Sequence, residues 1–236
     1  DSKFIFFQSI FCKESSIAFT KFKPSKYKIL YNSIPNLLYK SKKNNNPKVL
    51  NIIISGYFNE MNFYIVEPAI NVIYKMAKRL EKSPRLIIYG LKKKQLNSKL
   101  KKKIQYLEYK NKVMIMDNYN IKNISLILKN IHLALHLKYK DPCPNSVLER
   151  MHYGIPHIIS HSGGTPELTG NSSINIKVRD TWQFLVKVDE KKLYNSIIVA
   201  TKKYGLLKKR TYKQIKKFNW KNYVSTHEKI FKQYVS

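Results

Sequence analysis

The sequence contains few cysteine, arginine, glycine and acidic residues. Cys12 and Cys143 are its two cysteines, and they stand far apart without the spacing of a metal site. A disulfide framework is therefore excluded, and we expect free thiols in a reducing compartment, the cytoplasm. Only five of the 45 basic residues are arginine and only 14 residues are acidic, which leaves a formal net charge of +31.

The shortage of arginine and glycine, set beside many Lys, Asn, Ile and Tyr residues, is typical of an AT-rich genome. Codon bias of this kind adds lysine without selection for a partner, so we favour a solvated lysine coat. The alternative is attraction to phosphates on a nucleotide, an anionic membrane surface or a nucleic acid. An anionic membrane therefore stays open as a partner, with peripheral attachment as the consequence.

Several motifs are also missing. No apolar run approaches the length of a membrane span. The six histidines lack a HExxH or similar pattern, so none is predicted to bind a metal. No Asp-X-Asp occurs either, which leaves a metal–diphosphate clamp without a candidate and predicts no metal and no cofactor. Without an aromatic–basic motif of the RRM or KH type, a nucleic-acid-binding module is the least favoured function.

What the chain does contain predicts an α/β fold. An apolar content of 43% favours a folded protein, and strand patterns alternate with helix patterns from residue 47 onward. Such alternation predicts a Rossmann-like parallel sheet with helices on both faces, followed by a helical tail. Strands are expected at 49–54, 86–89, 113–116, 133–137, 156–160 and 174–178, and helices at 65–80, 93–109, 121–130 and 181–234.

Local signals refine this pattern. The first strand should end at Ser55-Gly56, and Pro68 should lie in the first turn of its helix. The tail should break near Gly205 and at residues 218–219, and Lys40–Asn46 resembles a linker. The opening KFIFFQSIF should form a buried strand and turn, as if the chain began inside a larger protein.

The run from Asp141 to Gly170 carries most of the functional information. Asp141 and Glu149 have seven residues between them, and they stand in a loop and in the helix after it. Such a loop opens into the crevice beyond the carboxyl ends of parallel strands, where ligands bind. Ser146-Val-Leu-Glu149 also fits a capping box, which gives Glu149 a structural role, and Asp141 before Pro142 fits an Asx-type loop.

The same run predicts its own boundaries. Gly154 fits a left-handed helix end with Pro156 just beyond it, so the helix should be short. Gly163-Gly164 permits positive φ or a close backbone approach. Glu167 is expected to cap the turn that Thr165-Pro166 starts.

These residues resemble the donor-binding signature of the family-4 retaining glycosyltransferases, which have the two-domain GT-B architecture. The matching residues, in order, are Asp141, Glu149, Gly154-Ile-Pro156, Ile158-Ile159 and Gly163-Gly-Thr-Pro-Glu167. The stretch DPCPN resembles a branch of the family with Asp in place of the usual first Glu. Phe7–Lys13, Tyr31–Ser33 and Phe218–Trp220 are similar to segments that flank this domain in the family.

The resemblance covers almost the whole chain but only the second half of a complete enzyme. It implies a connecting segment over 1–46, a Rossmann-like nucleotide-sugar-binding domain over 47–180 and a C-terminal helical tail over 181–236. An N-terminal acceptor domain would be the missing partner. Apolar side chains would then lack partners near both chain ends, at Phe4, Phe6, Phe7, Phe11, Tyr223, Ile230, Phe231 and Tyr234.

The resemblance also implies roles. Asp141 would contact donor sugar hydroxyls and Glu149 the ribose, as the catalytic pair. The donor would be a UDP or GDP sugar. Its diphosphate would lie near Gly56 and the amides around Pro144, Asn145, Ser146 and Val147, its base near Asp117, Asn118 and Tyr119, with Gly163, Gly164 and Thr165 also donor-binding.

One departure stands out in the family pattern. The stretch Tyr57–Phe63 holds no basic residue where the family usually places a basic pair for the diphosphate. Taken as a whole, the resemblance implies retaining transfer of a hexosyl group to an unidentified acceptor, with this chain as the donor-binding half. The alternative is a non-catalytic remnant, or a subunit completed by a separate N-terminal acceptor domain.

Overall fold

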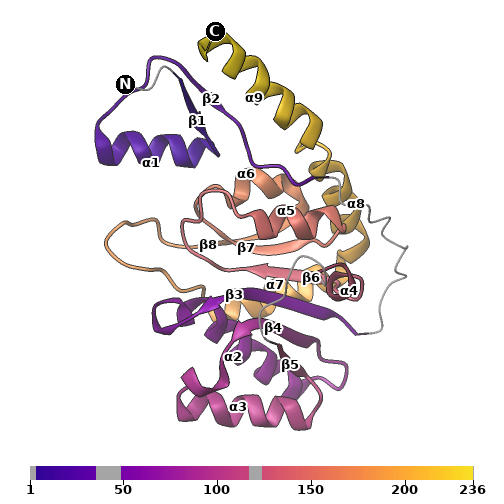
Figure 1. Ribbon diagram of the computed structural model, residues 1–236. Helices are drawn as coiled ribbons and strands as arrows, with labels where there is room; N and C mark the ends of the chain where they lie inside the picture. The colour runs from indigo at the N-terminus through magenta and orange to yellow at the C-terminus, as the bar shows by residue number, and fades with distance from the viewer. Residues whose placement is uncertain (1–3, 36–48, 117–123, 236) are drawn as a thin grey trace.

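The computed structural model describes residues 4–35, 49–116 and 124–235, and its centre is a six-stranded parallel sheet (Figure 1). The strands are β3 (Asn51–Phe58), β4 (Arg85–Leu91), β5 (Val113–Met116), β6 (Leu133–His136), β7 (His157–His161) and β8 (Ser173–Lys177). Their spatial order is β5-β4-β3-β6-β7-β8, and each neighbouring pair is parallel. This is the doubly wound Rossmann order, in which the direction of winding reverses between β3 and β6.

Helices cover both faces of the sheet (Figure 1). One face packs against α2 (Phe63–Arg79), α3 (Ser98–Tyr109) and α7 (Glu190–Lys202), around the β-branched and leucine side chains of the central strands. The other face packs against α4 (Ile124–Leu128), α5 (Asn145–His152) and α6 (Thr165–Thr169). The predicted α/β class with a parallel sheet between helices is therefore confirmed.

The two ends of the chain meet above α5 and α6 (Figure 1). A two-stranded parallel sheet of β1 (Ile5–Phe7) and β2 (Tyr27–Ile29) flanks α1 (Ile10–Thr20). The tail continues from α7 through α8 (Tyr204–Ile215) to α9 (Trp220–Val235), which returns to β1. Ring centroids lie 5.4 Å apart for Phe4 and Tyr234, and 4.5 Å apart for Phe6 and His227.

Several predicted boundaries were wrong. β3 runs past Gly56 to Phe58, and its register with β4 shifts between Ser55 and Phe58. The helix α2 begins at Phe63 after a short 3-10 helix over Glu60–Asn62, so Pro68 lies beyond the first turn. β4 likewise continues through Gly90, which takes φ +82. In both strands, pairing with the neighbouring strand continues past the glycine that was predicted to end the strand.

The ends of the chain also differ from expectation. A helix, α1, follows β1 where a turn was expected, because the Ser9 side chain accepts a hydrogen bond from Cys12 N and caps it. The tail does break near Gly205, at Lys203, and again between Ile215 and Trp220 as predicted, but its helices begin only at Glu190 rather than near residue 181. Two further 3-10 helices span Lys93–Gln95 and Gly170–Ser172. The linker-like stretch Lys40–Asn46 lies outside the described residues.

Candidate functional site

A cavity of about 270 Å³ opens where the winding direction of the sheet reverses. It lies at the carboxyl ends of β3 and β6, the place where open α/β sheets bind ligands. This volume is below the roughly 300–1,000 Å³ of pockets for drug-sized ligands, so we regard the cavity as one part of a larger site. Its lining consists of Ser55, Gly56, Tyr57, Phe58, Asn62, Ile65, Leu135, His136, Leu137, Lys138, Asp141 and Ser146.

Asp141 is the carboxylate that lines this cavity. Its side chain is 13% exposed, and its Oδ2 lies 3.4 Å from His136 Nε2 and 3.1 Å from Lys138 Nζ. Burial alone would raise the pKa of Asp141, but the contacts with His136 and Lys138 outweigh it and lower the pKa below its usual value. Asp141 is therefore a fixed anion at neutral pH.

The loop that carries Asp141 is held from two sides. Tyr139 Oη accepts a hydrogen bond from Thr181 N at 2.7 Å, and Tyr139 N donates to Tyr64 Oη at 3.2 Å. Lys140 takes φ +52, and its Nζ lies 2.6 Å from Asp180 and 3.6 Å from the ring centroid of Trp182. A non-glycine residue at positive φ is uncommon, and these contacts compensate for it. The loop is thus fixed before any ligand binds.

The helix after this loop does not form the predicted capping box. Pro144 is its N-cap residue and Asn145 its first residue, so Ser146 lies inside the helix and no side chain caps it. Val147 N donates to Pro144 O at 3.1 Å. Within the described residues, the N–H groups of Asn145 and Ser146 have no hydrogen-bond acceptor. Free amides at a helix start favour an anionic ligand.

Glu149 therefore has no capping role in this helix. Its side chain is partly buried, and within the described part of the chain it forms no ion pair or hydrogen bond. Burial raises the pKa of Glu149, and the neighbouring Arg150 charge lowers it in part. Glu149 is absent from the lining of the cavity. A partly buried carboxyl with no hydrogen bond among the described residues is available as an acceptor for a ligand. The other predicted helix boundary is confirmed, since Gly154 takes φ +69 just after the helix.

The two glycines of the Gly-Gly turn lie against the backbone of the Asp141 loop. A Cβ at Gly163, where φ is +68, would come 2.5 Å from Asp141 O, and one at Gly164 would come 1.9 Å from Pro142 O. Gly164 N donates to Asp141 O at 2.9 Å. Gly163, Gly164 and Thr165 are not among the residues that line the cavity. In this structure the glycine pair positions Asp141, because only glycine permits so close an approach.

Glu167 caps a different helix from the one expected. Its carboxylate accepts hydrogen bonds from Ile10 N and Phe11 N, both at 2.8 Å, and from Tyr31 Oη at 2.8 Å. The prediction that it caps the turn at Thr165-Pro166 was therefore wrong. The sequence could not show this, because α1 lies more than 150 residues away along the chain. Glu167 joins the N-terminal segment to the helix that follows the glycine pair.

Sequence reasoning missed three basic side chains near the cavity. His136 and Lys138 line it, and Arg150 lies beneath it, 1% exposed, and donates a hydrogen bond to Ser55 Oγ. Burial lowers the pKa of His136, so its imidazole is neutral beside the Arg150 charge. Their positions were the available signal, since His136 lies at the end of the predicted strand 133–137 and Lys138 follows that strand, just before Asp141.

Only some of the predicted site residues line the cavity. Of the predicted residues, Gly56, Asp141 and Ser146 meet in the cavity, whereas Pro144, Asn145 and Val147 lie outside its lining. Asp117, Asn118 and Tyr119 fall outside the described residues. Across residues 4–35, 49–116 and 124–235, no three His, Cys, Asp or Glu side chains gather closely enough to hold a metal ion. Both cysteines are free thiols, as expected.

The fold defines a Rossmann-type α/β protein with a cavity at its switch point. The model of the family described as glycosyl transferases group 1 matches residues 39–218, about three quarters of the chain. The chain belongs to this family. No curated protein matches the sequence closely enough to add a nearer relative.

Several solved structures share the fold at low sequence identity. Sucrose-phosphate synthase from Thermosynechococcus elongatus has a TM-score of 0.70 at 16% identity, over 99% of this chain and 58% of that one. A glycosyltransferase from Rickettsia africae has a TM-score of 0.67 at 14% identity, over 98% of this chain and 63% of that one. Alr3699/HepE from Anabaena, solved with UDP and glucose, has a TM-score of 0.70 at 14% identity, over 100% and 63%. The chain therefore spans about three fifths of each of these proteins.

No described helix combines the length and the apolar character that a membrane crossing needs.

Proposed function

We propose that this chain is the donor-binding half of a retaining GT-B glycosyltransferase. The donor would be a nucleotide-diphosphate sugar of the UDP or GDP type, and the acceptor is unidentified. One observation carries the proposal: the cavity at the switch point brings Asp141, Ser146 and Gly56 together from three separate elements. These are residues to which the family resemblance gives contacts with the donor.

The chemistry of the cavity suits such a donor. Asp141 is a fixed acceptor for sugar hydroxyls, and the amides of Asn145 and Ser146 are donors for phosphate oxygens. In the transfer, the bond between the anomeric carbon and the diphosphate breaks and a bond to the acceptor oxygen forms on the same face. The acceptor loses its proton, and the nucleoside diphosphate leaves with the bonding electrons. Preorganised donors would stabilise the developing charge without a metal clamp.

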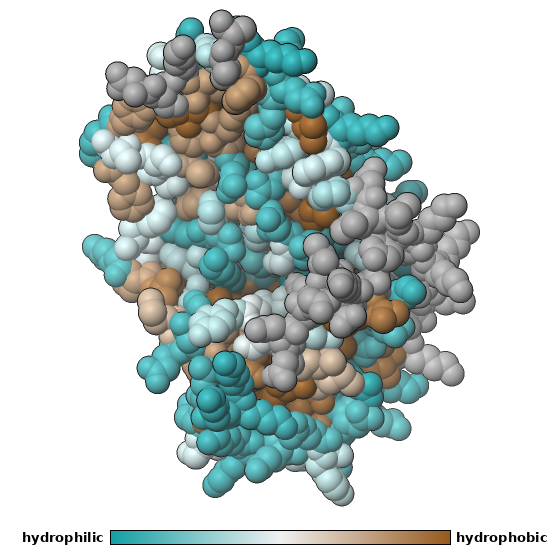
Figure 2. Space-filling view, in the orientation of Figure 1, coloured by the Kyte–Doolittle hydropathy of each residue, from teal (hydrophilic) through white to brown (hydrophobic). Residues whose placement is uncertain are grey.

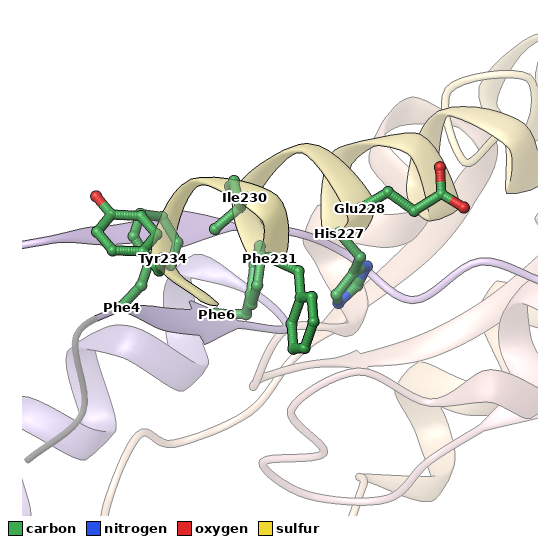
Figure 3. Close-up of a pocket in the computed structure, with 7 residues that line it drawn as sticks. All are labelled: Phe4, Phe6, His227, Glu228, Ile230, Phe231 and Tyr234. Carbon is green, nitrogen blue, oxygen red and sulfur yellow. The ribbon is translucent and has the colours of Figure 1, made fainter. Parts of the chain in front are cut away.

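The apolar groove between β1 and α9 favours a partner domain. Figure 3 shows Phe4 and Phe6 from the β1 side facing His227, Phe231 and Tyr234 from α9, while Glu228 points away. The groove has a volume of about 480 Å³, and Phe231 is 66% exposed. Figure 2 shows apolar side chains gathered over this end of the molecule. An N-terminal acceptor domain is the partner that we propose for it.

The exposed lysines would also allow contact with an anionic membrane surface. Figure 2 shows hydrophilic side chains over α3, whose Lys99, Lys101 and Lys102 are exposed. An anionic membrane surface would attract such a coat, with peripheral attachment as the result. The same charges on an ordinary solvated surface would need no partner.

A second candidate function follows from the loop after β3. Residues 57–62, at the end of β3 and in the loop after it, contain Glu60 and no basic residue, so they provide no cation for a diphosphate. A non-catalytic remnant, or a subunit completed by a separate N-terminal partner, would tolerate that composition. Donor affinity separates these functions, because a remnant does not need to keep it.

Titration by calorimetry with UDP, GDP and their common sugar conjugates tests the proposal. We expect one nucleotide family to bind, and Glu149→Ala to weaken that binding about tenfold, equivalent to about 1.4 kcal/mol. The loss follows from the contact between the carboxyl and the ribose hydroxyls. Circular dichroism and a urea midpoint equal to wild type would show that the variant still folds.

Glu81→Ala is the matched control, because Glu81 is exposed in the turn after α2 and the substitution removes the same charge. It should bind like wild type. If none of the nucleotides binds the wild-type chain, the proposal fails in favour of the remnant or the incomplete subunit.

A further inference from the structure

The charges that line the cavity are few and unevenly placed. Among the described residues that form its wall, Asp141 is the carboxylate and Lys138 the lysine, while the arc from Ser55 to Phe58 is uncharged. A nucleoside diphosphate brings two to three negative charges, and oxygen atoms of that kind bind most strongly to cationic donors. The carboxyl end of β6 is thus the side of the cavity that offers a cation.

Lys138 is placed for this task by its backbone. Its carbonyl oxygen accepts a hydrogen bond from Ser160 Oγ at 2.8 Å, which ties the end of β6 to β7. The side chain is 49% exposed and lines the cavity, with Nζ 3.1 Å from Asp141 Oδ2. Lys140, two residues on, is 8% exposed and held by Asp180 and Trp182. Of these two lysines, Lys138 is therefore the one with access to a ligand.

Arg150 adds positive charge behind the wall. Its guanidinium is buried and donates to Ser55 Oγ, and Ser55 itself lines the cavity at the end of β3. A charge in the low-dielectric interior acts over a longer distance than one in water. His136, between Arg150 and Asp141, stays neutral because burial lowers its pKa, so it adds no second cation. Arg150 thus places a buried positive charge behind Ser55, although it is not among the described residues that line the cavity.

We propose that Lys138 binds the diphosphate of the donor by leaving Asp141, which frees the Asp141 carboxylate to accept hydroxyls of the donor sugar. This inference rests on the proposed function. The ion pair of Lys138 and Asp141 is then a resting state, in which each group neutralises the other until the donor supplies a partner for both. The diphosphate is held from β6 rather than from the loop after β3.

A purely structural ion pair makes a different prediction. If Lys138 only neutralises Asp141, neither residue touches the diphosphate, and changing either one leaves nucleotide affinity alone. If Lys138 instead moves from Asp141 to the diphosphate, the Asp141 carboxylate and the ligand compete for the same ammonium group. Removing the carboxylate charge should then tighten the binding of a nucleoside diphosphate that carries no sugar. The two substitutions should thus shift affinity in opposite directions.

The experiment measures the affinities of UDP and GDP by calorimetry, with uridine and guanosine as probes that lack phosphate. Lys138→Gln should weaken binding of the nucleoside diphosphate at least tenfold and leave the nucleoside unchanged. Lys138→Arg should stay within about threefold of wild type, and Asp141→Asn should bind several-fold more tightly. The tenfold difference should shrink in added salt, because counterions screen a half-exposed charge.

Lys101→Gln is the matched control, since Lys101 is exposed on α3 and the variant has the same net charge as Lys138→Gln. It should bind like wild type. Equal nucleotide affinity of Lys138→Gln and wild type overturns the inference and leaves the proposed function standing. An equal loss for the nucleoside overturns it too, as does weaker binding by Asp141→Asn. Absence of nucleotide binding in the wild-type chain overturns the proposed function itself.

Discussion

Burial lowers the pKa of four of the six histidines. They are His132, His136, His152 and His157. His157 is the extreme case, with 1% of its surface exposed and a pKa well below its ordinary value, to which the nearby Arg150 charge contributes after burial. These side chains are neutral in the folded protein at pH values where the unfolded chain begins to bind protons.

We therefore expect the free energy of unfolding to fall as the pH drops below about 6.5. In that range the unfolded state binds more protons than the folded state, so stability rises with pH, by up to about 1.4 kcal/mol per pH unit for His157 alone. Urea unfolding at pH 7.5, 6.5 and 5.5 measures the slope. His157→Gln should flatten it, and exposed His161→Gln is the matched control. Identical slopes for wild type and His157→Gln would contradict the expectation.

At the same scale, the sequence indicated the carboxylate that lines the cavity but not the cations near it. Asp141 was predictable because it follows a strand and precedes a helix. Lys138 was not, because the chain has lysines almost everywhere and one of them gains meaning only by its 3.1 Å contact with Asp141. Arg150 was hidden for another reason. A charged residue on a helix normally faces water, and here it faces the sheet.

Among the elements, α1 is stabilised at its start by a side chain that is distant in the sequence. Glu167 accepts two hydrogen bonds from its first amides, so a carboxylate lies at the positive end of the helix dipole. On the far side, Phe11 and Phe19 of α1 pack on Trp182, with ring centroids 5.8 and 4.7 Å away. The helix thereby connects the segment after the glycine pair to the loop that holds Lys140.

Glu167→Gln should destabilise the protein by about 0.5–2 kcal/mol, the usual cost of losing a helix cap. The amide keeps one acceptor oxygen but turns a donor toward the other α1 amide. Urea unfolding gives the loss, and Trp182 fluorescence should report a change in the packing of α1. Glu14→Gln, on the exposed side of the same helix, removes the same charge as a control. Equal unfolding of the two variants would refute the capping role.

The elements also show where the sequence pattern was sufficient. The six strands of the sheet and the alternation with helices were predictable, because buried parallel strands are continuous β-branched runs. Their ends were less so. Gly56 and Gly90 read as strand ends, yet both lie within strands, because ladder hydrogen bonds to neighbours outweigh a local preference. The capping box failed similarly, since Pro144 starts the helix before Ser146.

For the whole molecule, the expectation that eight apolar side chains near the chain ends lack partners was only partly right. Phe7 is buried, Phe11 stacks on Trp182, and Phe4 packs on Tyr234. The two chain ends thus supply partners for each other, which the sequence could not show because they are over 200 residues apart. What remains open is the groove beside Phe231, the most exposed phenylalanine there.

We also expect the chain to self-associate through this groove. At a net charge of +31 the molecules repel one another, so association should grow with both protein concentration and salt, as the repulsion is screened. Light scattering after size exclusion would measure it. Phe231→Glu should abolish association, whereas Phe184→Glu, which alters an exposed ring in another loop, should not. A clean monomer of the wild-type chain at high concentration and high salt would mean that the groove is too small to bind a second copy. Its apolar surface would then favour the larger face of a partner domain.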